Sequence, residues 1–395
     1  MAEPVSESLL SYYRRTGLNA GEIRLETDAD WQAQIRKRHN LYENHLQIPL
    51  ALLRDRSVLE FGCASGENAL VLAARGARLT LVEPNSSVIP RLRALFENFE
   101  LTSQIARLSQ DEIDAFQTSE QFDIALAEGF LFTLPNRDEI IARLCGWLKP
   151  GGIGVVSFND RCGMLLECIK RLVLRRACQL AGVHNIEGEA SFGLATQLFG
   201  PSYASLGASR AFRTWWKDNL VSKLLAARYL WSFQELLPQI ERGGCEFYAS
   251  SPKWSRVDHF TWYKKVANVT ARHQRVLDDL RGVLVFLLLG VAEPDARPAS
   301  TEVLDAVIEL QEQISHYTTD ANPDIATVTY SRALDAYLGD YPNPTVQAFN
   351  ADMKTLFDLL RRDSESELVG GYQKLQSLQA LWGTPYHYLA FKKSE

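Results

Sequence analysis

The most informative part of the chain is the stretch Ser57-Val58-Leu59-Glu60-Phe61-Gly62-Cys63-Ala64-Ser65-Gly66-Glu67-Asn68. A short apolar run ends there on a carboxylate, a loop of small residues follows at once, and a helical apolar pattern begins at Leu70. This order predicts a strand, a tight turn and a helix start, the junction where α/β sheets bind their ligands. Gly62 and Gly66 would let a ligand approach the backbone without a Cβ in the way.

A second carboxylate closes the next apolar run, because Glu83 follows directly after Arg78-Leu79-Thr80-Leu81-Val82. An acid in that place can accept hydrogen bonds from both hydroxyls of a ribose. The loop amides at the predicted helix start would favour negative charge.

Strand and helix patterns alternate through residues 57–158. We expect strands at 57–61, 79–83, 104–108, 122–128 and 152–158, and helices at 66–75, 86–99, 111–117 and 136–148. The alternation predicts a parallel sheet with helices on both faces. Leu148-Lys149-Pro150-Gly151-Gly152 predicts a sharp reversal between the last helix and strand, because Pro150 cannot continue a helix.

The loop resembles motif I of the class I S-adenosylmethionine (SAM)-dependent methyltransferases, an acid followed by three alternating glycines. The first and last glycines stand as Gly62 and Gly66, and Ala64 replaces the middle one, which we expect to tighten packing without loss of binding. The turn at Leu148–Gly152 is a second resemblance. A nicotinamide or flavin enzyme would instead want glycine at Glu67, so the spacing favours the methyltransferase.

The resemblance implies an α/β, Rossmann-like fold: a doubly wound, mostly parallel seven-stranded sheet with an antiparallel last strand. Cys245–Ser250 would form the sixth strand and Tyr386–Lys392 the seventh. Residues 268–383 are then a helical insertion within the last hairpin, with 17 acidic and 9 basic residues. Two roles are open for this acidic insertion, a wall of the substrate pocket or a dimer contact.

We therefore expect four parts: an N-terminal helical cap at 1–50, a SAM-binding core at 51–267 with a helical segment at 160–243, the insertion at 268–383, and a final core strand at 384–395. The cap either packs on the sheet edge or covers the cofactor, with Tyr12, Tyr13 or Tyr42 near the substrate.

In the helical segment, Lys170, Arg171, Arg175 and Arg176 alternate with apolar residues. We favour a solvated helix face there over contact with an anionic substrate or a lipid surface.

The resemblance also assigns site residues. The methionine part of the cofactor falls to Glu60 and the loop, the ribose to Glu83, and the adenine amino group to Gln110 or Asp111. Asp111 could equally cap a helix at 111–117. Glu128, Gly129 and Phe130 follow the fourth strand, where the family places methyl-transfer contacts. The cofactor-binding residues implied in this way are Glu60, Gly62, Cys63, Ala64, Gly66, Glu83, Gln110, Asp111, Glu128, Gly129 and Phe130.

Catalytic residues are harder to name, because methyl transfer from a sulfonium depends mainly on alignment of the attacking atom. A base is needed only if the nucleophile must lose a proton. His259 and Glu128 are the candidates for that base, although a structural role is the favoured interpretation of His259. The spacing of His, Cys and acidic residues predicts no metal, and a hydrolase is not supported because no Gly-x-Ser-x-Gly elbow occurs.

Composition and length limit the possible classes of protein. The chain has 395 residues, 46% of them hydrophobic, and a net charge of −6. The length suggests about two domains, and a whole-chain basic field for nucleic acid is absent. Six cysteines without a Cys-x-x-Cys pair indicate reduced thiols in a cytoplasmic protein. We see no signal peptide, and the longest apolar run, Val283 to Leu289, falls far short of the roughly 20 residues of a membrane span.

These observations predict a SAM-dependent methyltransferase that acts on an oxygen or nitrogen of a small-molecule or glycan-type acceptor. The sequence allows a homodimer. Two alternatives stay open: another enzyme on the same scaffold, such as an aminopropyltransferase or an NAD-dependent oxidoreductase, and a non-catalytic SAM-binding interaction protein.

Overall fold

The computed structural model describes residues 8–16, 25–207, 211–223, 226–254, 268–291, 297–320 and 322–395. The chain divides into two compact units. The first unit comprises Met1–Phe158, Phe233–Leu277 and His387–Glu395, and the second comprises Asn159–Ser232 and Asp278–Tyr386. We had expected the segment 160–243 to belong to the core; in the observed division, residues up to Ser232 group instead with the insertion.

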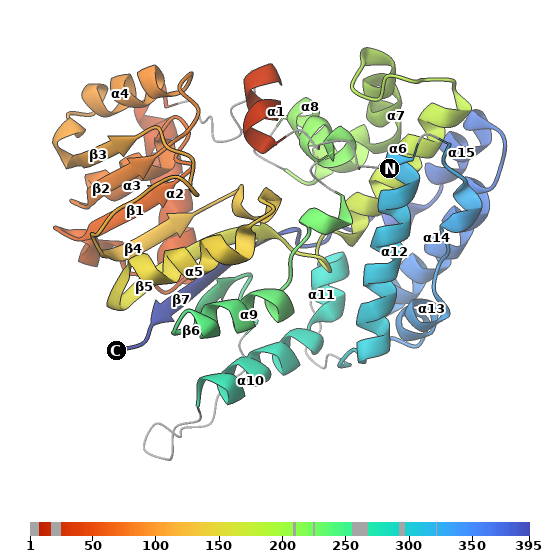
Figure 1. Ribbon diagram of the computed structural model, residues 1–395. Helices are drawn as coiled ribbons and strands as arrows, with labels where there is room; N and C mark the ends of the chain where they lie inside the picture. The colour runs from red at the N-terminus through yellow and green to blue at the C-terminus, as the bar shows by residue number, and fades with distance from the viewer. Residues whose placement is uncertain are drawn as a thin grey trace. The chain divides into compact units, whose positions relative to one another are not determined.

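The first unit contains a seven-stranded sheet in the order β3-β2-β1-β4-β5-β7-β6 (Figure 1). Its strands are β1 (Ser57–Phe61), β2 (Arg78–Val82), β3 (Ile105–Ser109), β4 (Phe122–Ala127), β5 (Leu148–Asn159), β6 (Cys245–Ser251) and β7 (Tyr386–Lys393). β1 pairs in parallel with β2 and β4, and parallel pairing continues to β3 and β5. β6 pairs antiparallel with β7. The expected sheet is therefore confirmed, with its chain reversal between the last two strands.

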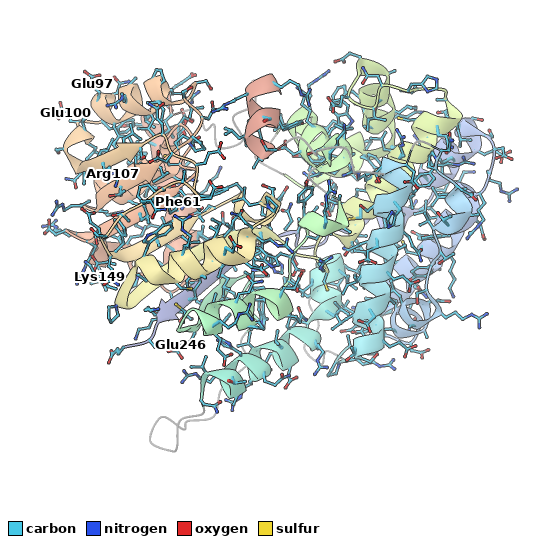
Figure 2. The ribbon with its side chains drawn as sticks, in the orientation of Figure 1. Phe61, Glu97, Glu100, Arg107, Lys149 and Glu246 are labelled. Atoms are coloured by element: carbon cyan, nitrogen blue, oxygen red, sulfur yellow. The ribbon has the colours of Figure 1, made fainter. Side chains whose placement is uncertain are left out.

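Helices cover this sheet. They are α1 (Leu9–Thr16), α2 (Asp28–His39), η1 (Asn40–His45), η2 (Leu50–Leu53), α3 (Glu67–Ala74), α4 (Ile89–Asn98), η3 (Thr102–Gln104), η4 (Leu131–Thr133), α5 (Arg137–Trp147), α9 (Phe233–Arg242) and most of α10 (Val269–Arg281). Phe61, labelled in Figure 2, is fully buried and stacks on Trp147 of α5 with 5.2 Å between ring centroids. Such apolar contacts hold helix and sheet together and fix the position of the loop that follows β1.

Two local expectations were wrong. Residues 111–117 form one turn and no helix, since the N–H groups of Ala115 and Phe116 both donate to the Glu112 carbonyl at 3.0 Å. Packing explains the interruption, because Phe116 is buried against Phe61 with 5.4 Å between centroids. The Leu148–Gly152 segment already belongs to β5, where an irregularity of register takes the place of a turn ahead of the strand.

The second unit is helical. Its elements are α6 (Leu165–Leu180), α7 (Glu189–Ser205), α8 (Phe212–Trp215), η5 (Trp216–Val221), η7 (Ala227–Tyr229), α11 (Leu284–Leu289), α12 (Thr301–Thr319), η8 (Ile325–Thr327), α13 (Arg332–Gly339), α14 (Pro344–Leu360), α15 (Glu365–Tyr372) and α16 (Gln376–Ala380). Side-chain caps mark several helix starts: Ser300, Ser331, Asn343 and Ser364 each accept a backbone N–H of the following turn.

α6 lies in the core of this unit, and the expected solvated basic face is not found. Lys170, Arg171 and Arg176 are between 2% and 7% exposed. The charge pattern of a surface helix was misleading here because other elements of the unit pack on α6, among them α7, α12 and η5. None of the helices in the described residues is both long and apolar enough to cross a membrane.

Candidate cofactor-binding site

The loop after β1 turns sharply into α3 because two glycines adopt left-handed backbone conformations. Gly66 stands at the N-terminal cap of α3 with a φ of 88°. A Cβ added there would lie 3.1 Å from Leu92 and from Phe96 of α4, so both conformation and space require glycine. Gly62 has a φ of 66°, and its N–H donates to the Val82 carbonyl at 2.8 Å, which ties the loop to β2.

Phe130 lies directly against this loop. A Cβ added to Gly62 would be 2.9 Å from two atoms of the Phe130 ring. The structure thus brings together the loop after β1 and the segment after β4. Ala64, in place of the family's middle glycine, has a φ of 49°, which is uncommon for a residue with a Cβ.

Glu83 connects the loop to the end of β2. The carboxylate is 6% exposed and accepts one backbone N–H on each oxygen, from Ala64 and from Asn85, both at 2.8 Å. Burial raises the pKa of Glu83, and these two hydrogen bonds oppose that rise. Arg14 of α1 donates to the neighbouring Pro84 carbonyl at 2.9 Å, so the N-terminal segment reaches this side of the loop.

Glu60, the acid on β1, is the least satisfied carboxylate of the site. It is 3% exposed, and its Oε2 has no hydrogen-bond partner among the described residues. Burial, with a smaller contribution from the charge of Glu128, raises the pKa of Glu60 to about 8. A buried acid of this kind is suited to a cationic partner, whose charge would restore the ionised form.

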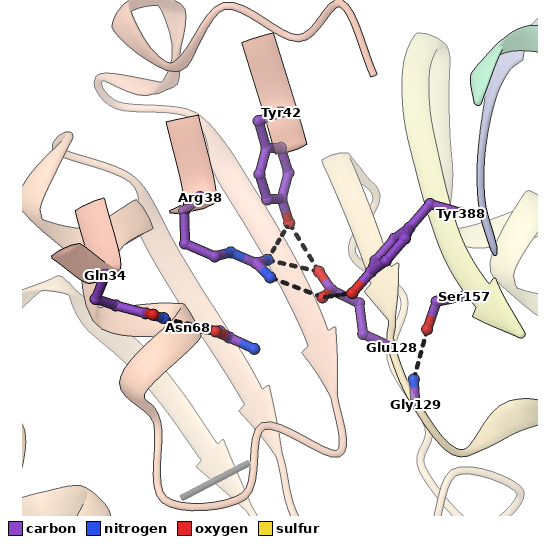
Figure 3. Close-up of polar contacts among 8 residues, drawn as sticks. All are labelled: Gln34, Arg38, Tyr42, Asn68, Glu128, Gly129, Ser157 and Tyr388. Carbon is purple, nitrogen blue, oxygen red and sulfur yellow. Dashed lines mark hydrogen bonds and ion pairs between the residues drawn. The ribbon is translucent and has the colours of Figure 1, made fainter. Parts of the chain in front are cut away.

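Glu128, directly after β4, is by contrast fully engaged (Figure 3). Arg38 of α2 donates from Nη1 to Oε2 at 2.9 Å and from Nη2 to Oε1 at 2.7 Å. The hydroxyls of Tyr42 and Tyr388 donate to the same carboxylate at 2.9 and 3.4 Å. Burial alone would raise the pKa of Glu128, but the Arg38 charge and these hydrogen bonds outweigh it and hold that pKa below its ordinary value.

Helix α2 is anchored at the same edge of the sheet. α2 starts at a capping box in which Thr27 accepts the Asp30 N–H and Asp30 accepts the Thr27 N–H. Further along the helix, the Gln34 amide donates to Asn68 of α3 at 2.9 Å (Figure 3). Near Glu128, the Gly129 N–H donates to the Ser157 hydroxyl at 2.7 Å, which ties the segment after β4 to β5.

The other expected site residues are less closely tied to this cluster. Cys63 is buried, and burial raises its thiol pKa, so it is a poor nucleophile. Gln110 and Asp111 are exposed after β3, where Asp111 accepts the Ser109 hydroxyl. His259 lies outside the described residues. No group of three or more metal-ligating side chains is found in the part of the chain that the structure describes.

Sequence reasoning missed Arg38 and Tyr388 as site residues. A signal existed for Arg38, because this charged residue occupies the otherwise mostly apolar helical stripe of Trp31, Ile35 and Tyr42. Tyr388 lies in the last strand, 260 residues from Glu128, and only the sheet order brings it near.

Comparison with known proteins identifies the class. Residues 32–186 match the family described as methyltransferase domain. The tRNA U34 carboxymethyltransferase of Hydrogenovibrio crunogenus is 31% identical over 30% of this chain and 37% of its own length. The ubiquinone biosynthesis O-methyltransferase of Rickettsia felis is 26% identical over 26% of this chain and 41% of its own length. This chain therefore spans about two-fifths of the length of these curated relatives.

A solved structure is also similar, that of PKMT2 from Rickettsia typhi in complex with AdoHcy, at 18% identity over 52% of this chain and 44% of that one. The TM-score of that comparison is 0.37. Residues 32–186 therefore carry a methyltransferase domain of the class I, SAM-dependent kind, and SAM is the cofactor of that domain.

Proposed function

We propose that this chain transfers the methyl group of SAM to an oxygen or nitrogen atom of a small-molecule or glycan-type acceptor. One observation supports the cofactor part of this proposal: three acidic side chains, Glu60, Glu83 and Glu128, gather at the loop. Arg38 pairs with Glu128, and Arg14 lies near Glu83. SAM brings an ammonium and a sulfonium cation, which acidic surroundings stabilise. The pyrophosphate of a dinucleotide would be repelled by the same carboxylates.

The chain's own residues fit the parts of SAM. The free Oε2 of Glu60 would accept a hydrogen bond from the ammonium group. Each Glu83 oxygen accepts a single backbone N–H, which leaves a further lone pair on each for a ribose hydroxyl. Gly62, Cys63, Ala64 and Gly66 would contact the methionine part through their backbone, and Gln110 or Asp111 would meet the adenine amino group.

SAM supplies an activated methyl group, so the protein's contribution is to align the acceptor atom and, for a hydroxyl, to remove its proton. Glu128 is poorly suited to take that proton, because its pKa is lowered and it already accepts four hydrogen bonds. We therefore propose that Glu128 positions the segment of Gly129 and Phe130. His259 stays the proposed base for an acceptor hydroxyl.

The names of two similar enzymes support a small-molecule acceptor. Trans-aconitate 2-methyltransferase of Deinococcus radiodurans, 29% identical over 110 residues, and the ubiquinone O-methyltransferase both carry small molecules in their names. The net charge of −6 argues against a nucleic-acid acceptor such as the one named for the tRNA enzyme. All six cysteines are free, which supports a reducing compartment and a cytoplasmic location.

Calorimetric titration of the purified protein with SAM, S-adenosylhomocysteine and NADH tests the cofactor. Micromolar binding of both sulfur nucleotides without NADH binding is the expected result, and NADH binding would overturn the proposal. Transfer of a labelled methyl group from SAM to a panel of hydroxyl, amine and glycan acceptors then tests the activity. SAM binding with no transfer on a broad panel would favour a non-catalytic SAM-binding protein.

His259→Ala tests the proposed base. It should lower kcat while the dissociation constant of SAM is unchanged, because the proposed role is confined to proton removal. Full activity in this variant would return His259 to a structural role.

A further inference from the structure

Two arginines of α6 line a pocket in the second unit. Arg171 and Arg175 are four residues apart, so their side chains lie on one face of the helix. The pocket is open to solvent, and its lining consists of Arg171, Leu174, Arg175, Ile186, Leu220, Val221 and Thr318. These lining residues include two cations and no carboxylate.

The hydrogen-bonding capacity of the two arginines is largely unused. Arg171 is 5% exposed, and among the described residues its guanidinium donates from Nη1 to the Ser222 carbonyl at 2.7 Å. The Nε of Arg175 is buried and has no hydrogen-bond partner in the described part of the chain. A buried donor left in this state costs free energy unless a ligand satisfies it.

Arg176, the next residue of the same helix, has by contrast a structural role. Arg176 donates from Nε to the Leu360 carbonyl, from Nη1 to Gln179, and from Nη2 to the Arg362 carbonyl and Asp363. Every nitrogen of that guanidinium has a partner. Burial lowers the pKa of Arg171 to about 10, and the nearby charge of Arg175 makes a smaller contribution in the same direction.

We propose that this pocket binds the oxyanion of a ligand, a phosphate or carboxylate group, between Arg171 and Arg175. Guanidinium groups pair with such oxyanions through parallel N–H donors. The enclosed part of the pocket has room for about one water molecule, so a single anionic oxygen enters and the rest of the ligand stays at the mouth. Leu174, Ile186, Leu220 and Val221 would contact its apolar portion. This site goes beyond the proposed methyl transfer and does not depend on it.

The test uses Arg175→Gln, because no described hydrogen bond is lost with this side chain. Lys374→Gln is the matched control, since it removes the same charge from an exposed position of the second unit. Thermal unfolding of the full chain is followed while inorganic phosphate or acetate replaces chloride at constant ionic strength. Titrations with phenyl phosphate and benzoate then ask whether an apolar body adds affinity and which anionic group is preferred.

We expect a saturable rise in Tm with phosphate or acetate for the unaltered protein and for Lys374→Gln. Arg175→Gln should need an anion concentration at least tenfold higher for the same rise. Without ligand, Arg175→Gln should match or exceed the Tm of the unaltered protein, because an uncompensated cation is gone. The proposal would be overturned if chloride, phosphate and acetate gave the same Tm, or if Arg175→Gln showed the same rise in Tm as the unaltered protein. A lower ligand-free Tm of Arg175→Gln would also count against it, since it would indicate a structural arginine.

Discussion

Arg38 and Glu128, 90 residues apart in sequence, form a bidentate ion pair with N–O distances of 2.9 and 2.7 Å. Their side chains are 6% and 9% exposed. The pair joins α2 to the segment after β4, whose Phe130 ring lies against Gly62 of the loop after β1. Removing one member of a buried pair strands the other charge in a medium of low polarity.

Arg38→Leu should therefore lower the free energy of unfolding by about 3–5 kcal/mol, the usual cost of breaking a buried pair. Arg38→Lys should retain part of this stability, because the positive charge stays. The remainder is lost because an ammonium group cannot make two parallel hydrogen bonds to the carboxylate. Urea unfolding measures both variants. Glu128→Leu and the double variant Arg38→Leu, Glu128→Leu complete the cycle. The loss in the double variant should be smaller than the sum of the two single losses, and a loss equal to that sum would show that the two residues do not interact.

The fold could be predicted because its signals are local. The apolar runs of β1, β2 and β4 each end at a polar or small residue, and the strands were expected within one residue of their observed bounds. The cofactor loop was visible for the same reason, since Glu60, Gly62 and Gly66 lie within seven residues of sequence.

The remaining features depend on distant contacts, which local patterns do not contain. The partners of Glu128 come from α2 and η1 near one end of the chain and from β7 near the other. The burial of α6 depends on helices that follow it, and nothing in the spacing of Lys170, Arg171 and Arg176 reveals that they will be covered. The missing helix at 111–117 is lost to the packing of Phe116.

Glu83→Ala should weaken SAM binding by roughly 1–3 kcal/mol, because it removes charge-assisted hydrogen bonds to the ribose. Calorimetric titration gives the dissociation constant. The variant also frees the N–H groups of Ala64 and Asn85, so Tm without ligand must be measured beside it. An unchanged dissociation constant would refute the ribose role. Asp111→Ala is an informative companion, since loss of affinity there would support the adenine contact.

Ala64→Gly should relieve backbone strain in the loop, because a φ of 49° favours glycine. The gain is partly offset by the greater freedom of glycine in the unfolded chain, so we expect a change in stability below about 1 kcal/mol. SAM affinity should stay within about threefold of the unaltered protein, since the alanine methyl is small. A loss of affinity above tenfold would show that the methyl group itself contacts the cofactor.

Glu60 should make the stability of the ligand-free protein depend on pH. Its pKa in the folded chain is about 8, above the ordinary carboxyl value of 4.5. The folded state therefore binds a proton that the unfolded state has lost, and the contribution of Glu60 to stability falls as pH rises from about 4.5 to 8. Glu60→Gln removes this dependence, so its Tm relative to the unaltered protein should increase between pH 5.5 and pH 8. Equal pH profiles would show that Glu60 is already ionised.

The same carboxyl group links cofactor binding to proton release. At pH 7, below its pKa of about 8, Glu60 is mostly protonated without ligand. If the SAM ammonium group binds at its free Oε2, the positive charge lowers the pKa and the proton leaves. Titration calorimetry in buffers of different ionisation enthalpy should then show release of a large fraction of one proton per SAM bound. Glu60→Gln should bind SAM more weakly and release less, and this difference isolates Glu60 from Glu83, whose pKa is also raised. Identical proton release in both proteins would place the ammonium group away from Glu60.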